Sequence, residues 1–387
     1  MAKFRILSLD GGGSWALIQA MALIDLYGGS ATGHEVLHDF DLAAANSGGS
    51  IVLGCLVEDM KLSEILVFFL SLKKRKTIFV EKLHLWYTPK YVAVDKLKGL
   101  VAALPVRGRW FLPDAARDIV SSSTGKPVHL LITSFEFDRC RGRFFRSAPA
   151  KGPSWGGGDP AQVQLAEAIH ASTNAPVLYF DKPAELLSEQ GKRYWDGGVS
   201  GCNNPVLAAV AEAVVLGNKP EDIVALSIGT GTVALPPARP GAAPADYFAS
   251  PAKQGILPDI ERMAGSILDD PPDAASFLAH VLTGGPPGLP KPVDSRVVRM
   301  SPMISPVQDA TGTWSPPKGL EDPAFKKVAG LTMDAVAQDE VDAIQNLASL
   351  WLQSIVRNQP IRMGADLKSE VGQDFYRDAK AAWLAVR

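Results

Sequence analysis

Short apolar runs alternate with helical patterns from the N-terminus to residue 227, and this alternation limits the fold more than any other feature of the sequence. The runs Phe4–Leu9, Leu42–Ala45, Val128–Ser134 and Ile223–Ser227 are short and apolar, and turn residues follow each of them. We interpret them as central strands. Trp15–Leu26, between the first two runs, has the unbroken length of a buried helix. Strands that alternate with helices predict a mostly parallel sheet covered on both faces, so we expect a three-layer α/β/α fold.

One domain can hold the whole chain. Length alone allows two or three domains, but α/β proteins of this size often form around one sheet, and we expect a single domain over residues 1–387. Prolines and glycines cluster within residues 232–295, which we expect to be a loop or lid insertion. A helical pattern begins at Asp322 and continues to about Ile355, and a further amphipathic stretch lies near the C-terminus. We expect these helices, within residues 322–387, to pack on the core.

The charges and cysteines exclude several classes of protein. Lys and Arg number 39 against 41 Asp and Glu, and the net charge of −2 disfavours a dedicated nucleic-acid binder. Cys55, Cys140 and Cys202 form an odd, widely spaced set that indicates neither a disulfide framework nor a zinc ribbon. The N-terminal sequence reaches Asp10 and three glycines before an apolar run long enough for a signal peptide can develop. We therefore expect a reduced, cytoplasmic protein.

A basic run follows an apolar run near residue 70. Ile65–Leu70 is apolar, is too short to span a bilayer, and is followed by the four cations of residues 73–76. We favour a buried helix whose C-terminal turn is solvated, because cations suit that end of the helix dipole. The alternative is transient contact with an anionic membrane surface.

The first candidate site is the glycine-rich sequence Asp10–Gly13, which directly follows a predicted strand and precedes a helix. Glycines leave backbone N–H groups free to point at an anion, and the helix N-terminus adds a favourable potential. The anion could be a phosphate or a developing oxyanion. A relaxed dinucleotide pattern that ends at Ala16 also fits, with Asp25 or Glu35 as the ribose ligand, and a plain strand-to-helix turn is a third interpretation.

The second candidate is Ser47, which follows the predicted strand Leu42–Ala45 and precedes a helix over Ile51–Val57. This is the context of a nucleophile elbow, where small neighbours permit the strained turn that holds a serine oxygen out of the sheet. Ala45 stands in place of the usual first glycine of G-x-S-x-G. A helix N-cap is the alternative role for this serine. In the elbow interpretation the supporting neighbours are Ala45, Asn46, Gly48 and Gly49.

The third candidate is Asp196, which follows an apolar approach and precedes Gly197 and Gly198. A lone Asp-Gly-Gly is most often a turn, but two glycines also allow another backbone or a substrate to approach the carboxylate. None of the six histidines lies in a convincing loop motif, so an ordinary triad has poor support. Asp196 could serve as the base directly if a partly dehydrated site raises its pKa from about 3.9.

These three signals, in this order, resemble the patatin-like phospholipase family. The resemblance continues through Lys126–Ser147, which is similar to the family's central strand and hairpin, and through Ala168–Phe180, which is similar to its Ala/Ser-rich helix and Ala-Pro turn. Ser227–Gly231 also matches, and Leu331–Leu350 resembles the terminal helix. The similarity therefore covers nearly the whole chain and is weakest over Pro236–Pro292.

The resemblance implies a patatin-like fold and hydrolysis of lipid acyl esters, of the phospholipase A or carboxylesterase type, without a metal or another cofactor. The implied partner is a lipid or acyl-ester substrate. Ser47 matches the nucleophile of a Ser–Asp dyad, and Asp196 matches its base. Gly11, Gly12 and Gly13 match the oxyanion loop.

One departure from the family follows the glycine loop. A basic residue and a glycine are usual there, whereas this chain has Trp15 and Ala16. The indole cannot replace a cation electrostatically, so we expect the rate or the headgroup preference to differ. Trp15 could line an acyl pocket, although we favour a core tryptophan because aromatic side chains so often pack in cores.

Three other functions fit part of the sequence. Asp10–Ser14 and Ser227–Gly231 together resemble the two phosphate loops of actin-like sugar kinases, but that function leaves Ser47 and Asp196 unexplained. A catalytically weakened, lipid-binding member of the patatin-like family would account for the departures from the family's motifs. A dehydrogenase fits least, because no later segment completes a second nucleotide-binding half.

Overall fold

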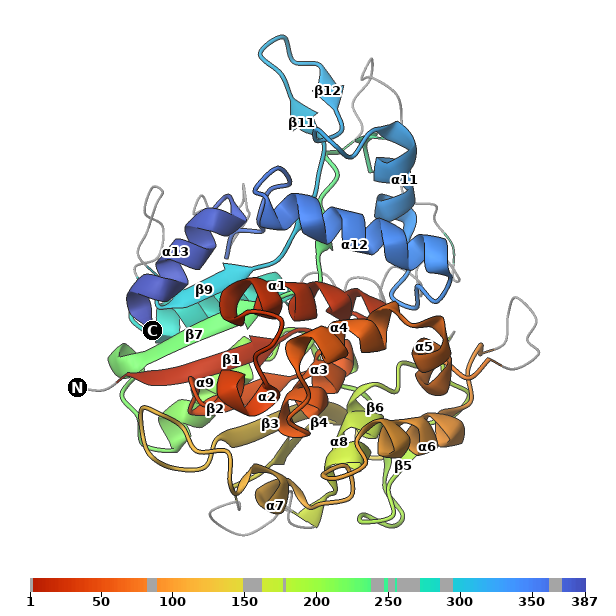
Figure 1. Ribbon diagram of the computed structural model, residues 1–387, viewed down its shortest axis with the longest axis vertical. Coiled ribbons are helices and arrows are strands. Elements are labelled where there is room, and N and C mark those ends of the chain that lie inside the picture. The colour runs from red at the N-terminus through yellow and green to blue at the C-terminus, as the bar shows by residue number, and fades with distance from the viewer. Residues whose placement is uncertain are drawn as a thin grey trace.

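An eight-stranded sheet forms the centre of the computed structural model (Figure 1). The structure describes residues 3–81, 89–148, 162–176, 179–237, 247–249, 255, 272–285, 295–361 and 371–387. The strands of the sheet are β1 (Phe4–Leu9), β2 (Leu42–Ala45), β3 (His129–Glu136), β4 (Arg141–Arg146), β5 (Ala184–Glu185), β6 (Arg193–Asp196), β7 (Ile223–Ile228) and β9 (Val297–Met300). Their order is β5-β6-β3-β2-β1-β7-β9, with β4 paired to β3, and the strands from β3 to β9 in this order run parallel. The predicted mostly parallel sheet is confirmed.

Alternate side chains of the central strands point to opposite faces of the sheet, and both faces are buried. In β1, Leu7 and Leu9 belong to the larger hydrophobic core, whereas Phe4 and Ile6 belong to a second core on the opposite face. This burial on both sides explains why the strands read as continuous apolar runs in the sequence.

Helices cover both faces, which completes the three layers (Figure 1). On the face of the second core, Ala275 and Ala279 of a helix over residues 272–282 pack with α9 (Val206–Val215). The larger core includes side chains from α1 (Leu17–Tyr27), α2 (Gly33–Leu37), α3 (Ser47–Val57), α4 (Leu62–Leu70), α5 (Leu72–Ile78), α6 (Ala93–Ala103), α7 (Leu112–Ala116) and α8 (Leu165–Ser172).

The C-terminal helices also belong to the larger core. Trp351 and Trp383 are both fully buried there. They come from α12 (Gln338–Leu352) and α13 (Tyr376–Val386), and α11 (Asp322–Gly330) precedes both.

The helical pattern predicted to continue from Asp322 to about Ile355 is divided in the structure. Residues 331–337 leave the helix between α11 and α12, and we call them the α11–α12 turn. The carbonyl oxygen of Met333 accepts a hydrogen bond from the Ser14 N–H at 3.0 Å. The prediction of one continuous helix is therefore wrong here. The Met333 carbonyl oxygen accepts from a distant loop, whereas in a helix it would accept from the amide four residues later.

Most of the predicted insertion over residues 232–295 lies outside the described residues, so its role as a lid stays a prediction. At its start, β8 (Thr232–Val233) pairs in parallel with β10 (Met303–Ile304). A separate hairpin of β11 (Val307–Gln308) and β12 (Trp314–Ser315) projects at one end of the molecule (Figure 1). No helix among the described residues combines the length and the apolar character that a membrane span needs.

Candidate active site

Ser47 lies at the turn where β2 ends and α3 begins. Its φ is +46°, in the left-handed region that L side chains rarely adopt and that costs about 1–2 kcal/mol. The N-cap of α3 is Asn46, so the alternative role of Ser47 as the N-cap is wrong. The methyl group of Ala45 is fully buried at the end of β2. A strained serine between a strand and a helix has the backbone geometry of a nucleophile elbow.

The two glycines after Ser47 allow the glycine-rich loop to approach the elbow. A Cβ atom on Gly48 would lie 2.4 Å from the carbonyl oxygen of Gly13. A Cβ atom on Gly49 would lie 2.5 Å from the carbonyl oxygen of Asp10. Since real Cβ atoms do not approach backbone oxygens so closely, larger residues at either position would push the loop away from Ser47.

Asp196 is the last residue of β6, and its carboxylate faces the elbow. Its Oδ1 accepts hydrogen bonds from the Gly198 N–H at 2.8 Å and from Asn46 Nδ2 at 3.0 Å. The Ser47 side chain lies close enough to this carboxylate to lower its pKa. The Asp196 N–H donates to the carbonyl oxygen of Asn174 at 3.0 Å. The structure therefore brings together the serine and the aspartate that the sequence singled out.

The environment of Asp196 favours its protonated form more than water does. Burial raises the pKa of Asp196, and this is the largest effect on it. Hydrogen bonds from Ser47, the Gly198 N–H and Asn46, together with the charge of Lys96, act in the opposite direction without cancelling the rise. A buried carboxylate with a raised pKa accepts a proton more readily than an exposed aspartate does.

Asn46 fixes the orientation of Asp196 from the neighbouring turn. Its Oδ1 accepts a hydrogen bond from Thr133 Oγ1 at 2.7 Å, which leaves its Nδ2 directed at the Asp196 carboxylate. A Cβ atom on Gly197 would lie 2.4 Å from Asn46 Oδ1. The Asn46 amide can therefore approach Asp196 only because Gly197 has no Cβ atom. Ser172 Oγ completes this contact region by accepting from the Ser47 N–H at 2.9 Å.

The backbone amides of the glycine-rich loop are not equivalent. The Gly11 N–H donates to the carbonyl oxygen of Asn203 at 2.8 Å, so this amide is already engaged. The Gly12 and Gly13 amides have no hydrogen-bond partner among the described residues. Gly13 has φ +56° and borders the same cavity as Ser47. The free donors nearest the elbow thus come from the second and third glycines.

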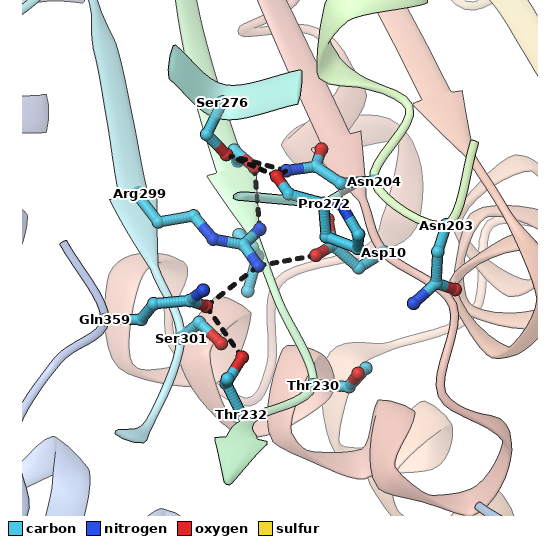
Figure 2. Close-up of polar contacts among 12 residues, drawn as sticks. Asp10, Asn203, Asn204, Thr230, Thr232, Pro272, Ser276, Arg299, Ser301 and Gln359 are labelled. Carbon is cyan, nitrogen blue, oxygen red and sulfur yellow. Dashed lines mark hydrogen bonds and ion pairs between the residues drawn. The ribbon is translucent and has the colours of Figure 1, made fainter. Parts of the chain in front are cut away.

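A buried ion pair holds the base of the loop. Arg299 of β9 contacts Asp10 Oδ2 at 2.6 Å, and both side chains are about 3% exposed. Arg299 also donates to Ser227 Oγ at 2.9 Å and to Gln359 Oε1 at 3.2 Å (Figure 2). Thr230 Oγ1 donates to the Gly11 carbonyl oxygen at 2.6 Å. The segment Ser227–Gly231, at the end of β7, therefore helps to hold the glycine-rich loop in place.

Comparison with known proteins identifies the family. The family model described as "Patatin-like phospholipase" matches residues 7–210, which is more than half of the chain. The chain belongs to the patatin-like phospholipase family. An "Intracellular phospholipase A2" of Caenorhabditis elegans is 28% identical over 243 residues, which cover 60% of this chain but only 20% of the nematode protein.

The structural comparison is more distant. The crystal structure of VipD from Legionella pneumophila has a TM-score of 0.38 and 10% identity, with 90% of this chain and 67% of that chain covered. A likeness this low supports no argument about function. The family assignment therefore rests on the sequence, and the mostly parallel α/β architecture on the structure itself.

A small, mostly apolar cavity adjoins Ser47 in this patatin-like protein. It measures about 20 Å³, which is close to the space that one water molecule needs. Because an acyl chain is much larger, side chains around the cavity must move when such a chain binds. The lining residues are Gly13, Ser47, Gly48, Ile51, Ile78, Phe79, Thr173, Ala175, Tyr179, Phe180, Met333 and Asp334.

Trp15, a departure from the patatin-like pattern, does not line this cavity. Its side chain is 7% exposed, and its Nε1–H donates to the carbonyl oxygen of Thr332 at 3.1 Å. The indole therefore connects the glycine-rich loop to the α11–α12 turn. This position agrees with the core tryptophan that the sequence analysis favoured.

The sequence did not single out several polar residues that lie near Ser47 and Asp196. Thr133, Ser172 and Asn174 fall in stretches whose resemblance to the family was noted, but no motif singled them out, and Asn203 lies in the loop after Asp196. Lys96 is fully buried on α6 although its sequence context is that of an ordinary amphipathic helix. Only the tertiary structure reveals these neighbours, because each comes from a different element.

Proposed function

We propose that this protein is a lipid acyl hydrolase of the phospholipase A or carboxylesterase type, with Ser47 as the nucleophile and Asp196 as the base. The observation that carries the proposal is a strained serine at a strand-to-helix turn whose side chain lies beside a buried carboxylate with a raised pKa. Membership of the patatin-like phospholipase family supports a lipid substrate.

The reaction proceeds in two halves. Ser47 Oγ attacks the ester carbonyl carbon while Asp196 accepts the hydroxyl proton, and the carbonyl π electrons move onto oxygen. The tetrahedral intermediate collapses to an acyl-enzyme as the alcohol leaves with the proton held by Asp196. Water then attacks the acyl carbon, Asp196 accepts a proton from it, and the carboxylic acid departs as Ser47 Oγ recovers that proton.

Backbone amides stabilise the oxyanion in both halves. Gly12 and Gly13 supply the donors in this proposal, because the Gly11 amide is engaged with Asn203. One well-placed donor contributes roughly 3 kcal/mol to transition-state stabilisation. Gly11 keeps a structural role within the predicted loop.

Two variants test the function directly. Ser47→Ala and Asp196→Asn should each abolish release of p-nitrophenol from a soluble acyl ester and of fatty acid from phospholipid vesicles. Circular dichroism checks that both variants remain folded, and Ser63→Ala, at an exposed serine of α4, is the matched control. Turnover by either variant at the wild-type rate would remove the assignment. Wild-type protein that bound lipid but neither hydrolysed esters nor reacted with a fluorophosphonate would indicate a binding member of the family.

The surface of α5 fits a peripheral membrane contact. Leu72, Lys73, Lys74 and Lys76 are exposed. Arg75 is instead buried and donates to the carbonyl oxygens of Phe69 and Val336. The expected solvated C-terminal turn is therefore wrong in part, because α4 ends at Leu70 and the basic run forms the separate helix α5. We propose that this face touches anionic lipid transiently and that the protein works in the cytoplasm.

Vesicle sedimentation tests the membrane contact. Lys73→Glu/Lys76→Glu should weaken binding to phosphatidylserine-containing vesicles while leaving hydrolysis of a soluble ester unchanged. Lys98→Glu, at an exposed lysine of α6, is the control for charge reversal elsewhere. Equal vesicle binding by wild type and the double variant would contradict the proposed contact.

A further inference from the structure

Lys96 is a fully buried lysine that the proposed reaction does not use. Its Nζ donates to the carbonyl oxygen of His170 at 3.0 Å and to Asn174 Oδ1 at 2.9 Å. The same Nζ lies 4.0 Å from the centroid of the Phe180 ring. Three donor directions of an ammonium group thus meet two oxygens and an aromatic face, which is the environment that a buried cation requires.

The contacts of Lys96 lead to both members of the dyad. Asn174, which accepts from Lys96, offers its carbonyl oxygen to the Asp196 N–H at 3.0 Å. His170 and Ser172 lie in the last turn of α8, where a cation is favourable for the helix dipole. Ser172 Oγ accepts from the Ser47 N–H at 2.9 Å. Lys96 therefore holds the segment that positions the backbones of the nucleophile and the base.

Lys96 is also the cation whose charge acts on Asp196. Its charge lowers the pKa of Asp196 against the larger effect of burial. Burial holds the pKa of Lys96 itself well below its usual value, and the charge of Asp196 only partly opposes that fall. Among the described residues, other titratable groups near Lys96 include His170 of α8, Lys182, and Asp181, whose Oδ1 accepts from the Ala93 N–H of α6 at 3.1 Å. Burial and the charges of Lys96 and Lys182 hold the pKa of His170 well below its usual range, so this imidazole stays neutral.

We propose that Lys96 is a positioning residue for the dyad: its ammonium fixes the Asn174 turn behind Asp196 and adds a positive charge that favours the carboxylate form of Asp196 over its protonated form. This inference rests on the proposed function, in which Asp196 is the base. It adds a third group to the site, which acts through the peptide and the field behind Asp196 without touching substrate.

The pH dependence of kcat/KM for a soluble p-nitrophenyl ester tests the inference. Activity requires the carboxylate form of Asp196, so kcat/KM rises with pH through the pKa of that group. Removing the nearby positive charge in Lys96→Met raises this pKa, and the acid limb should move to higher pH, with kcat at least tenfold lower and KM little changed. Lys96→Arg keeps the charge, and its acid limb should stay at the wild-type position.

The controls separate this inference from the proposed function. Lys98→Met removes an exposed lysine of the same helix and should leave the profile unchanged. Lys96→Gln retains a donor toward Asn174 and should shift the acid limb in the same direction as Lys96→Met. A wild-type acid limb in a folded neutral variant would overturn the inference, as would failure of both neutral variants to fold while Lys96→Arg folds. If Ser47→Ala or Asp196→Asn turned over the ester at the wild-type rate in this assay, the proposed function itself would fail.

Discussion

Asp10 and Asp196 occupy nearly the same local setting in two regions of the molecule. Each lies at the end of a strand of the central sheet and is at most 5% exposed, and three glycines follow Asp10 where two follow Asp196. Burial is the largest effect on both carboxyls and raises the pKa of each. Their partners differ: Asp10 contacts the guanidinium of Arg299, whereas Asp196 accepts from the neutral Asn46 amide and the Gly198 N–H and has the Ser47 hydroxyl beside it.

The difference shows that the Asp-Gly-Gly sequence does not decide the role of its aspartate. An arginine stays charged throughout the usual pH range, so Arg299 favours the anionic form of Asp10 against the larger effect of burial. A hydroxyl partner can itself give up a proton, and the charge of Lys96 reaches Asp196 without a direct hydrogen bond. We therefore expect the Asp10 region to determine stability and the Asp196 region to determine chemistry.

The largest expected effect is on chemistry at Asp196. Asp196→Asn should lower kcat/KM for a soluble ester by about a thousandfold, or roughly 4 kcal/mol of transition-state stabilisation, because the base is lost. Asp10→Asn, the matched substitution in the other region, should lower kcat/KM per folded molecule by less than about tenfold. Equal losses in the two variants would erase the distinction between the two regions.

The pH dependence of stability sharpens the same comparison. Because the pKa of Asp196 is raised in the native state, the wild type loses stability as the pH rises through that raised pKa. Asp196→Asn has no carboxyl group to titrate and does not show this loss. The difference in unfolding free energy between the variant and the wild type should therefore shift in favour of the variant as the pH increases from about 4. Urea unfolding at several pH values measures the difference, and a constant gap would argue against a raised pKa.

The next effect is on stability at Asp10. Asp10→Asn leaves the Arg299 charge buried without its counterion, and we expect a loss of about 3 kcal/mol in unfolding free energy. The double variant Asp10→Asn/Arg299→Met removes the unpaired charge and should recover part of that loss. Urea midpoints of the wild type, both single variants and the double variant give the coupling energy. A coupling energy near zero would show that the ion pair does not hold this region.

The smallest effect concerns the strain at Ser47. Glycine adopts a φ of +46° without the steric penalty of a Cβ atom, so Ser47→Gly should be more stable than Ser47→Ala by about 1 kcal/mol. Both variants lack the hydroxyl, which makes the pair a measure of backbone strain alone. Thermal unfolding of the two inactive proteins checks the difference. A more stable alanine variant would contradict the strained elbow.

The sequence predicted the parts of the fold that depend on local apolar patterns. Phe4–Leu9 and Leu42–Ala45 are strands with the predicted bounds, because runs buried on both faces are distinctive over a few residues. The motifs also indicated Ser47 and Asp196, since small residues beside a functional side chain leave a recognisable pattern. The contact between the two side chains required the structure.

Features that depend on distant contacts could not be predicted. The α11–α12 turn interrupts a helical pattern because two of its carbonyl oxygens accept hydrogen bonds from a distant loop. The Ser14 N–H donates to Met333, and the Trp15 Nε1–H donates to Thr332. The engagement of the Gly11 amide depends on Asn203, which no motif marks. Each of these features depends on a hydrogen-bond partner far away in the sequence. Hydrophobic periodicity and local propensity contain no information about such a partner.

The most direct measurement of the central claim is the site of covalent modification by a fluorophosphonate. Peptide mass spectrometry of the labelled wild-type protein should find the adduct on Ser47, and labelling of Asp196→Asn should be at least a hundredfold slower because the base no longer accepts the hydroxyl proton. Asp10→Asn should be labelled at close to the wild-type rate. An adduct on another residue, or equally fast labelling of Asp196→Asn, would contradict the Ser47–Asp196 dyad.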